Sequence, residues 1–243
     1  MKTKNLKDSF TKINYAFTLA EVLITLGIIG VVAAMTLPTL IQTNKNKEVE
    51  TKLQKIYSVM NQAILMSELD NGPKEYWSQS CGEGDSDIDC ETYYDKYILK
   101  YLNNVSKKTF TDAKGYNVAI YFEDGTVLVG KAGYDYFFFP SGKNFDIESF
   151  SAESEDNPGV MLREGQGSTF FAFRFMPSST SIKDKFHYKK GFEPYKYELE
   201  ELSTEATKKG NYACKINGNG GYCTTMIQLN GWKIPDDYPF KVR

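Results

Sequence analysis

Residues 16–44, AFTLAEVLITLGIIGVVAAMTLPTLIQTN, form an apolar segment that follows a lysine-rich stretch. From residue 22 to residue 44 the segment contains no ionisable side chain. A helix needs about 20 predominantly apolar residues to cross the hydrocarbon core of a bilayer. The segment therefore predicts a membrane-spanning helix near the start of the chain, and the rest of the molecule has to be organised around it.

The carboxylate of Glu21 lies just inside the start of this segment. An ionised side chain costs about 2.5–3.5 kcal/mol at the centre of a membrane helix, and less near the interface, so it is rarely retained without a partner. The nearest basic residues, Lys12 and Lys45, are more than one helical turn away. Cleavage between Ala16 and Phe17 would place a new α-amine four residues before Glu21, on the same helix face. The amine of a neighbouring copy would serve equally well.

These residues resemble the N-terminal cleavage and methylation segment of type IV pilins and type II secretion pseudopilins. In that family a short basic leader ends in Gly, cleavage occurs before Phe, and Glu is the fifth residue after the cut. The matching residues here are Phe17, Thr18, Leu19 and Glu21. Ala16 takes the place of the usual Gly. Positions at which pilins commonly have helix-weakening residues are occupied by Gly27, Gly30 and Pro38.

The resemblance implies a structural subunit and not an enzyme. A prepilin peptidase would remove residues 1–16 and methylate the amine of Phe17. The product would then assemble with like pilin subunits and with the inner-membrane assembly machinery. We therefore expect a leader peptide at 1–16, a transmembrane and polymerisation helix at 17–44, and a pilin-like head at 45–243 that includes a stem helix at 45–69. A pilus subunit and a secretion pseudopilin remain alternatives.

Charge predicts the orientation of the chain in the lipid bilayer. Four lysines and one aspartate give residues 1–16 a net charge of +3, which leaves −5 for the remainder of a chain whose total is −2. Because positive flanks stay on the cytoplasmic side, the head is expected outside the cytoplasm, first on the inner membrane and then in a pilus or a periplasmic filament. A mildly acidic head is not a general nucleic-acid binder.

Two alternatives to a filament subunit are compatible with an apolar N-terminal helix. One is an ordinary secretory signal peptide cleaved after the small residues Val32-x-Ala34, although the apolar run continues to Ile41 and such a signal has no use for Glu21. The other is a single-span anchored binding or adhesin domain that does not polymerise. Neither alternative needs a carboxylate five residues after a cut.

The remainder of the chain has the pattern of an α+β fold. Apolar residues recur at helical spacing from Val49 to Ile64, and the stop signal at residues 70–73 ends the stem near Leu69. Pro38 lacks an amide hydrogen, so we expect it to kink or locally open the helix.

After the stem, residues 93–102 predict a short helix, and residues 116–122 and 126–129 predict a hairpin around Asp124 and Gly125. Further strands are expected at residues 134–139, at 169–176 and around 186–188. A loop is expected at residues 148–168, and a short helix near residue 198. A long N-terminal helix packed on an antiparallel sheet follows, as in the pilins.

The four cysteines fit an oxidising compartment. Four cysteines allow three pairings, and we favour the two local ones, Cys81 with Cys90 and Cys214 with Cys223, which share the same spacing. The alternative is a metal site, but neither pair has C-x-x-C spacing or a nearby histidine.

Three weaker patterns in the sequence could form chemical sites. The single histidine, His187, is more consistent with packing than with catalysis, and no hydrolase, nucleotide or metalloprotease motif is present. Lysines 183, 185, 189 and 190 alternate with aromatic residues, but a solvated strand edge explains them better than nucleic-acid binding. No cofactor is expected, and the weak candidates for a calcium site are Asp85, Asp87 and Asp89 in the first cysteine loop, and Asp236 and Asp237 near the end of the chain.

Overall fold

The structure, a computed structural model, describes residues 18–77, 87–112, 115–131, 133–156 and 165–243. The chain divides into two compact units, residues 1–43 and residues 44–243. The first helix, α1 (Leu19–Asn71), contributes residues to both units.

The second half of α1 is the stem that the sequence predicts. Its buried residues recur at intervals of three and four, the spacing that places them on one face of a helix. They are Val49, Glu50, Leu53, Ile56, Met60, Ala63, Ile64 and Ser67. The helix ends at Asn71, and Gly72 follows with φ of 77°, a backbone conformation that favours glycine, before Pro73. The predicted end at residue 69 is therefore confirmed to within two residues.

In the described residues, six strands form one antiparallel sheet in sequential order. They are β1 (Val105–Asp112), β2 (Gly115–Phe122), β3 (Val127–Lys131), β4 (Asp135–Phe139), β5 (Phe171–Arg174) and β6 (Glu193–Pro194). The predicted hairpin is the β2–β3 pair, in which Tyr121 lies opposite Val127. Asp124 closes its turn by accepting hydrogen bonds from the backbone nitrogen and the hydroxyl of Thr126. A long helix on an antiparallel sheet confirms the α+β class.

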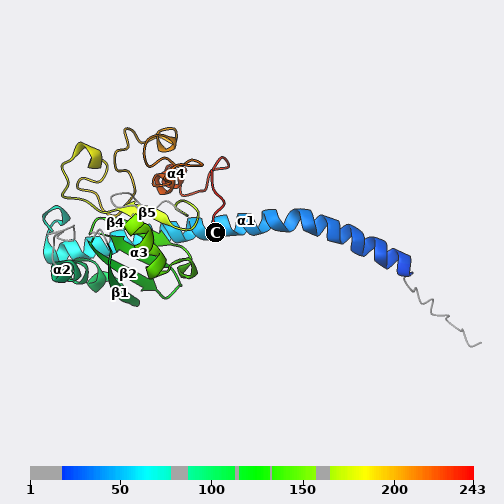
Figure 1. Cartoon of the computed structure of the whole chain (residues 1–243), viewed down its shortest axis with the longest axis horizontal. Helices are drawn as coiled ribbons and strands as arrows, with labels where there is room; N and C mark the ends of the chain where they lie inside the picture. Colours follow the sequence, from blue (N-terminus) through cyan, green and yellow to red (C-terminus); the bar gives the residue numbers. More distant parts are fainter. Residues whose placement is uncertain (1–17, 78–86, 113–114, 132, 157–164) are drawn as a thin grey trace, which may run out of the picture. The chain divides into compact units, whose positions relative to one another are not determined.

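Both faces of the sheet are covered. The stem and α2 (Asp87–Tyr97) pack on one face in a cluster that includes Leu53, Met60 and Phe173. On the opposite face, α3 (Ile147–Asp156) and the chain after β6 cover a second cluster, which includes Phe137, Phe150 and Tyr195. Figure 1 shows α3 and the α1 stem on opposite sides of the strands. The head is thus a three-layer arrangement with the stem as one outer layer.

Short helices complete the head. The last α-helix is α4 (Cys223–Leu229). Single 3₁₀ turns are η1 (Lys74–Tyr76), η2 (Leu99–Tyr101), η3 (Gly142–Asn144), η4 (Ile182–Asp184) and η5 (Ala206–Lys208). Together, α2 and η2 confirm the helix predicted at 93–102.

Three sequence predictions are wrong in the head. Residues 147–156 form α3 where a loop was expected. The segment around Phe186 and Tyr188 is a turn and not a strand, because the backbone nitrogens of His187 and Tyr188 both donate to the carbonyl oxygen of Asp184. Residue 198 lies in a turn with φ of 62° and not in a helix.

Polar contacts of Asn61 and Glu50 help to attach the stem to distant parts of the head. The side-chain amide of Asn61 donates to the carbonyl of Phe192 and accepts from its backbone nitrogen, at 2.9 and 3.0 Å. This contact requires glycine at position 191, since a Cβ there would lie 2.0 Å from the Asn61 oxygen. Glu50 accepts from the backbone nitrogen of Ile234 and from Lys233 Nζ, at 2.9 and 3.0 Å. The stem therefore orders the C-terminal segment as well as the sheet.

Candidate functional site at the start of the apolar helix

The N-terminus of α1 is closed by a reciprocal pair of contacts between Thr18 and Glu21. Thr18 Oγ1 accepts from the backbone nitrogen of Glu21 at 3.2 Å, and the backbone nitrogen of Thr18 donates to Glu21 Oε2 at 2.8 Å. The Thr18 hydroxyl also donates to the same carboxylate oxygen at 2.8 Å. This is a capping box, in which residues three apart satisfy nitrogens that lack a partner within the helix. Glu21 thus helps to define where the helix begins.

The capping box gives Glu21 hydrogen-bond partners that the sequence analysis does not predict. Sequence reasoning looked only for a cation and missed the hydrogen bonds that Thr18 supplies, although the spacing T-x-x-E was a usable signal. Within the described residues, Glu21 has no ion-pair partner. Ala16 and Phe17 lie outside the described residues, so the pairing of Glu21 with a Phe17 amine stays a prediction.

The first half of α1 exposes apolar side chains on all sides. It contains an 18-residue window of mean hydropathy 2.2, none of which is buried within the chain. The hydroxyls of Thr25, Thr36 and Thr43 each donate to a backbone carbonyl three or four residues earlier, at 3.0 Å. Since these polar groups are satisfied inside the helix, they do not oppose its transfer into lipid.

Gly27, Gly30 and Pro38 all lie inside the continuous helix. Apart from the adjoining backbone of the helix itself, no described atom lies within 4 Å of the position that a Cβ would occupy at Gly27 or Gly30. The absence of these side chains therefore leaves room for a helix that is not part of this chain. The chain stays helical through Pro38, so the helix does not open there, and the predicted kink stays a prediction.

Two family models match the chain. The model of the prokaryotic N-terminal methylation motif matches residues 12–37, and that of a family of unknown function, DUF6613, matches residues 39–242. The chain belongs to DUF6613. Neither a curated protein nor a solved structure matches it.

The methylation motif confirms the resemblance to type IV pilins and pseudopilins. The chain is a type IV pilin-like precursor of the kind that prepilin peptidase processes. Such a motif implies assembly with other pilin subunits, and it is typical of structural subunits and not of enzymes. The apolar helix next to the motif is consistent with a membrane anchor.

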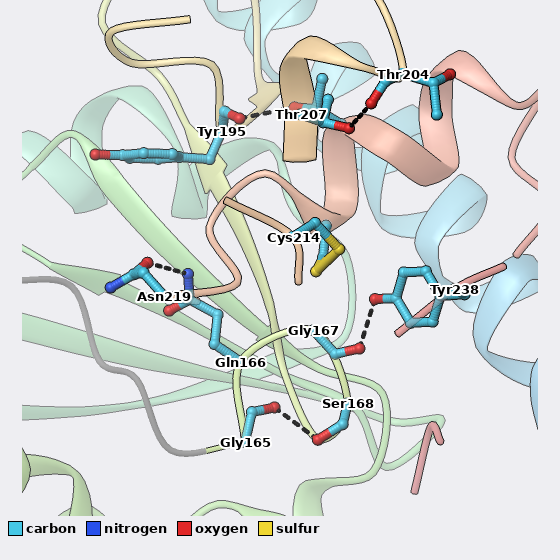
Figure 2. Close-up of a disulfide and its surroundings, with 12 residues drawn as sticks. Gly165, Gln166, Gly167, Ser168, Tyr195, Thr204, Thr207, Cys214, Asn219 and Tyr238 are labelled. Atoms are coloured by element: carbon cyan, nitrogen blue, oxygen red, sulfur yellow. Dashed lines mark hydrogen bonds between the residues drawn. A yellow bond between two sulfur atoms is a disulfide. The ribbon is translucent and has the colours of Figure 1, made fainter. Parts of the chain in front are cut away.

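A disulfide joins Cys214 to Cys223 as predicted, at the N-terminus of α4 (Figure 2). The loop around Gly167 packs against it so closely that a Cβ at this glycine would lie 2.7 Å from Cys223 Sγ. The hydroxyl of Tyr238 donates to the carbonyl of Gly167, as Figure 2 shows, and the backbone nitrogen of Arg243 donates to the carbonyl of Ser168. The disulfide therefore belongs to a cluster of contacts that fixes the end of the chain.

The other predicted pair falls partly outside the described residues. Cys81 and Asp85 are not described, and neither are the side chains of Asp87 and Asp89, which lie in the first turn of α2. Cys90 is buried in that helix. The Cys81–Cys90 bond and a calcium site in this loop therefore stay predictions.

The second group of acidic residues has a partner in the protein itself. Asp237 pairs with Lys208 Nζ at 3.0 Å, and this contact lowers the pKa of its carboxyl group. Asp236 is exposed. Among the residues that the structure describes, no three Asp, Glu, His or Cys side chains gather as metal ligands would. Within that part of the chain, Asp236 and Asp237 have no third side-chain ligand for calcium beside them.

The lysine-rich segment is less available to a phosphate chain than its sequence suggests. Lys183 Nζ pairs with Glu198 at 2.6 Å, and Lys185 Nζ donates to the carbonyl of Glu200. His187 lies between these lysines in sequence, but its side chain is fully buried and its Nε2 accepts from the backbone nitrogen of Lys196 at 3.0 Å. The histidine is thus a packing residue of the turn.

We expect His187 to make the protein less stable in acid. Burial, together with the positive charges of Arg174 and Lys196, holds the pKa of the imidazole well below its ordinary value of 6.5. The unfolded chain therefore takes up a proton near pH 6.5 and the folded one only at much lower pH. The free energy of unfolding should fall as pH drops below about 6.5, by up to ~1.4 kcal/mol per pH unit from this residue.

Denaturant unfolding of the detergent-solubilised protein between pH 7.5 and 5 measures this effect. His187→Gln is the matched control, because an amide oxygen can accept the Lys196 hydrogen bond and does not titrate. Its stability should depend less on pH than that of the unsubstituted protein. Equal slopes for the two proteins would assign the acid sensitivity to other groups.

Proposed function

We propose that this chain is a structural subunit of a type IV pilus or of a type II secretion filament. The observation that carries the proposal is the placement of Glu21 at the fifth position after the expected cut, inside a methylation motif. The proposal divides the chain into a leader at 1–16, a polymerisation helix at 17–44 and a head at 45–243. The mature subunit is anchored in the inner membrane with its head outside the cytoplasm.

Assembly in this proposal transfers the apolar helix from lipid into a bundle of like helices. The transfer changes little hydrophobic energy, because both surroundings are apolar. The interaction that sets the register between neighbouring subunits must therefore be polar. The Glu21 carboxylate, capped by Thr18 in the single chain, meets the Phe17 amine of a neighbouring subunit, and this pairing is worth more in the low dielectric of the bundle than in water.

The mature N-terminus tests the processing step. Mass spectrometry of the protein purified from its native membrane should give a chain that begins at Phe17 with a methylated amine. Sheared cell-surface or periplasmic fractions should contain the same species in filaments. A chain that begins after Ala34 would indicate an ordinary signal peptide. A chain that begins at Phe17 but is found only as a membrane-bound monomer would support the anchored adhesin instead.

A further inference from the structure

A pocket of about 340 Å³ opens on the head beside the start of α3. Four phenylalanine rings line it, from the end of β4, the first residues of α3 and the chain on either side of them. They are Phe139, Phe145, Phe150 and Phe170. The ring centroid of Phe139 lies 5.0 Å from that of Phe145 and 5.1 Å from that of Phe170. Because these rings pack against one another and only Phe145 is partly exposed, the pocket has a fixed apolar floor.

The rim of the same pocket is polar. It contains an amide, a carboxylate and two hydroxyls, all exposed or partly exposed, from Asn144, Asp146, Ser149 and Thr169. Asp146 caps the first turn of α3, since its Oδ2 accepts from the backbone nitrogen of Ser149 at 2.8 Å. Hydrogen bonds from Ser149 lower the pKa of the Asp146 carboxyl group, which therefore stays ionised and keeps lone pairs for another donor. The rim thus offers both donors and acceptors to a ligand.

Lys143 and Arg243 add two positive charges to this rim. Both side chains are exposed, and within the described part of the chain neither has a hydrogen-bond or ion-pair partner. Other exposed lysines of the head, such as Lys100 and Lys183, are paired with a carboxylate. The backbone nitrogen of Arg243 donates to the carbonyl of Ser168 at 3.0 Å, which fixes this residue beside the pocket. The pocket therefore has two cations available to an anionic group.

These three groups of side chains restrict the chemistry of a ligand. An aliphatic acid would dehydrate the rim without supplying hydrogen-bond partners, which is unfavourable. Inorganic phosphate would meet the two cations, but the Asp146 carboxylate would repel it and the aromatic floor would stay uncovered. A neutral sugar would leave both cations without a counter-charge. A ring that carries hydroxyls and a carboxylate complements the floor, the rim and the cations together.

We propose that this pocket binds a hexuronic acid residue of an acidic polysaccharide. The C–H groups of the sugar ring carry partial positive charge and pack on the aromatic floor, since the faces of aromatic rings are negative. The sugar hydroxyls exchange hydrogen bonds with the rim, and the carboxylate pairs with Lys143 and Arg243. A volume of about 340 Å³ is near the lower end of the ~300–1,000 Å³ range of small-molecule sites, so the pocket holds a short stretch of a longer chain. The proposal goes beyond the filament function and does not depend on it, because a single anchored subunit could bind the same ligand.

Saturation-transfer NMR on the detergent-solubilised full-length protein tests the class of ligand. The probes are the trisaccharides of galacturonic acid and of glucuronic acid, at low ionic strength. We expect at least one of them to bind saturably, with the strongest transfer to its ring C–H protons. The methyl ester of the same trisaccharide keeps the rings and hydroxyls but has no charge, and it should bind at least tenfold more weakly. No transfer to either acid, equal binding of the ester, or displacement by an equal concentration of inorganic phosphate overturns the proposal.

A matched pair of lysine substitutions tests the location of the site. Lys143→Met removes a cation of the rim, whereas Lys209→Met removes an exposed lysine that does not line the pocket. Both variants should retain wild-type thermal unfolding. We expect Lys143→Met to weaken binding of the acid at least fivefold and Lys209→Met to change it less than twofold. Equal affinities of the two variants overturn the assignment to this pocket. Because the measurement needs no filament, a negative result leaves the proposed function intact, and a failure of assembly does not affect the binding result.

Discussion

Glu21→Ala should insert into the membrane like the unsubstituted protein and lose filament assembly. Insertion is not impaired, because the substitution makes the apolar segment more apolar. Assembly should lose the proposed pairing between the carboxylate and the Phe17 amine of a neighbouring subunit. An ion pair at about 4 Å with an effective dielectric constant of about 20 is worth about 4 kcal/mol, which corresponds to about 10³ in an assembly equilibrium. Sheared filament yield, compared with membrane-extracted monomer, measures the loss.

The capping box allows the two roles of Glu21 to be separated. Glu21→Gln keeps a residue that can accept the Thr18 hydrogen bonds but has no charge, whereas Thr18→Ala removes the hydroxyl contacts and keeps the charge. If the charge selects the register, Gln should fail like Ala, and Thr18→Ala should assemble, with a loss of about 1 kcal/mol from the weaker helix start. Normal filaments from Glu21→Gln would show that capping, and not ion pairing, is what assembly requires.

The parts of the fold that could be predicted are those with a regular pattern in the sequence. The stem was recognised because Leu53, Ile56, Met60 and Ile64 repeat at helical spacing and are buried together. The β2–β3 hairpin was recognised because Asp124 and Gly125 separate two apolar strands, and Gly125 adopts the φ of 76° that this turn needs. In both cases the local pattern and the final burial agree.

The parts that were missed depend on contacts between distant residues. Strand β1 has four consecutive exposed residues from 106 to 109, so it lacks the alternation of a half-buried strand and is defined by its ladder with β2. In α3, the buried ring of Phe150 packs against Phe110 and Phe137. The local sequence indicates only the N-terminal cap of α3, in which Asp146 accepts a hydrogen bond from the backbone nitrogen of Ser149 at 2.8 Å.

The candidate site was predicted better than the packing around it. The motif alone located Glu21, and the local spacing of Cys214 and Cys223 gave the disulfide. The contact between Asn61 and the backbone of Phe192 joins residues 131 positions apart, and nothing in the sequence near either residue indicates it. Sequence patterns therefore identified the methylation motif but not the contacts that hold the stem to the head.

Arg174, at the end of β5, is the centre of a buried charge network. Its guanidinium pairs with Asp184 at 2.8 Å and with Asp135 on the neighbouring strand β4. Asp184 also accepts from the hydroxyl of Ser179 at 2.8 Å. The aromatic rings of Tyr134 and Tyr197 lie with their centroids 4.8 Å from the guanidinium carbon. Burial raises the pKa of the Asp135 carboxyl group, and the charge of Arg174 opposes that rise.

Arg174→Met should destabilise the head by about 3–5 kcal/mol. The substitution fills the site with an apolar side chain but leaves the buried Asp184 and the partly buried Asp135 without the guanidinium, which is the costly way to break a buried ion pair. Denaturant unfolding of the detergent-solubilised protein at pH 7.5 measures the loss. Adding Asp135→Asn and Asp184→Asn to the same chain removes the unpaired charges and should restore more than half of it. The matched surface control is Lys183→Met, which breaks the more exposed pair with Glu198 and should lower the free energy of unfolding far less than Arg174→Met does. Similar losses for Arg174→Met and Lys183→Met would mean that the network is solvated and does not hold the turn at Asp184 against the sheet.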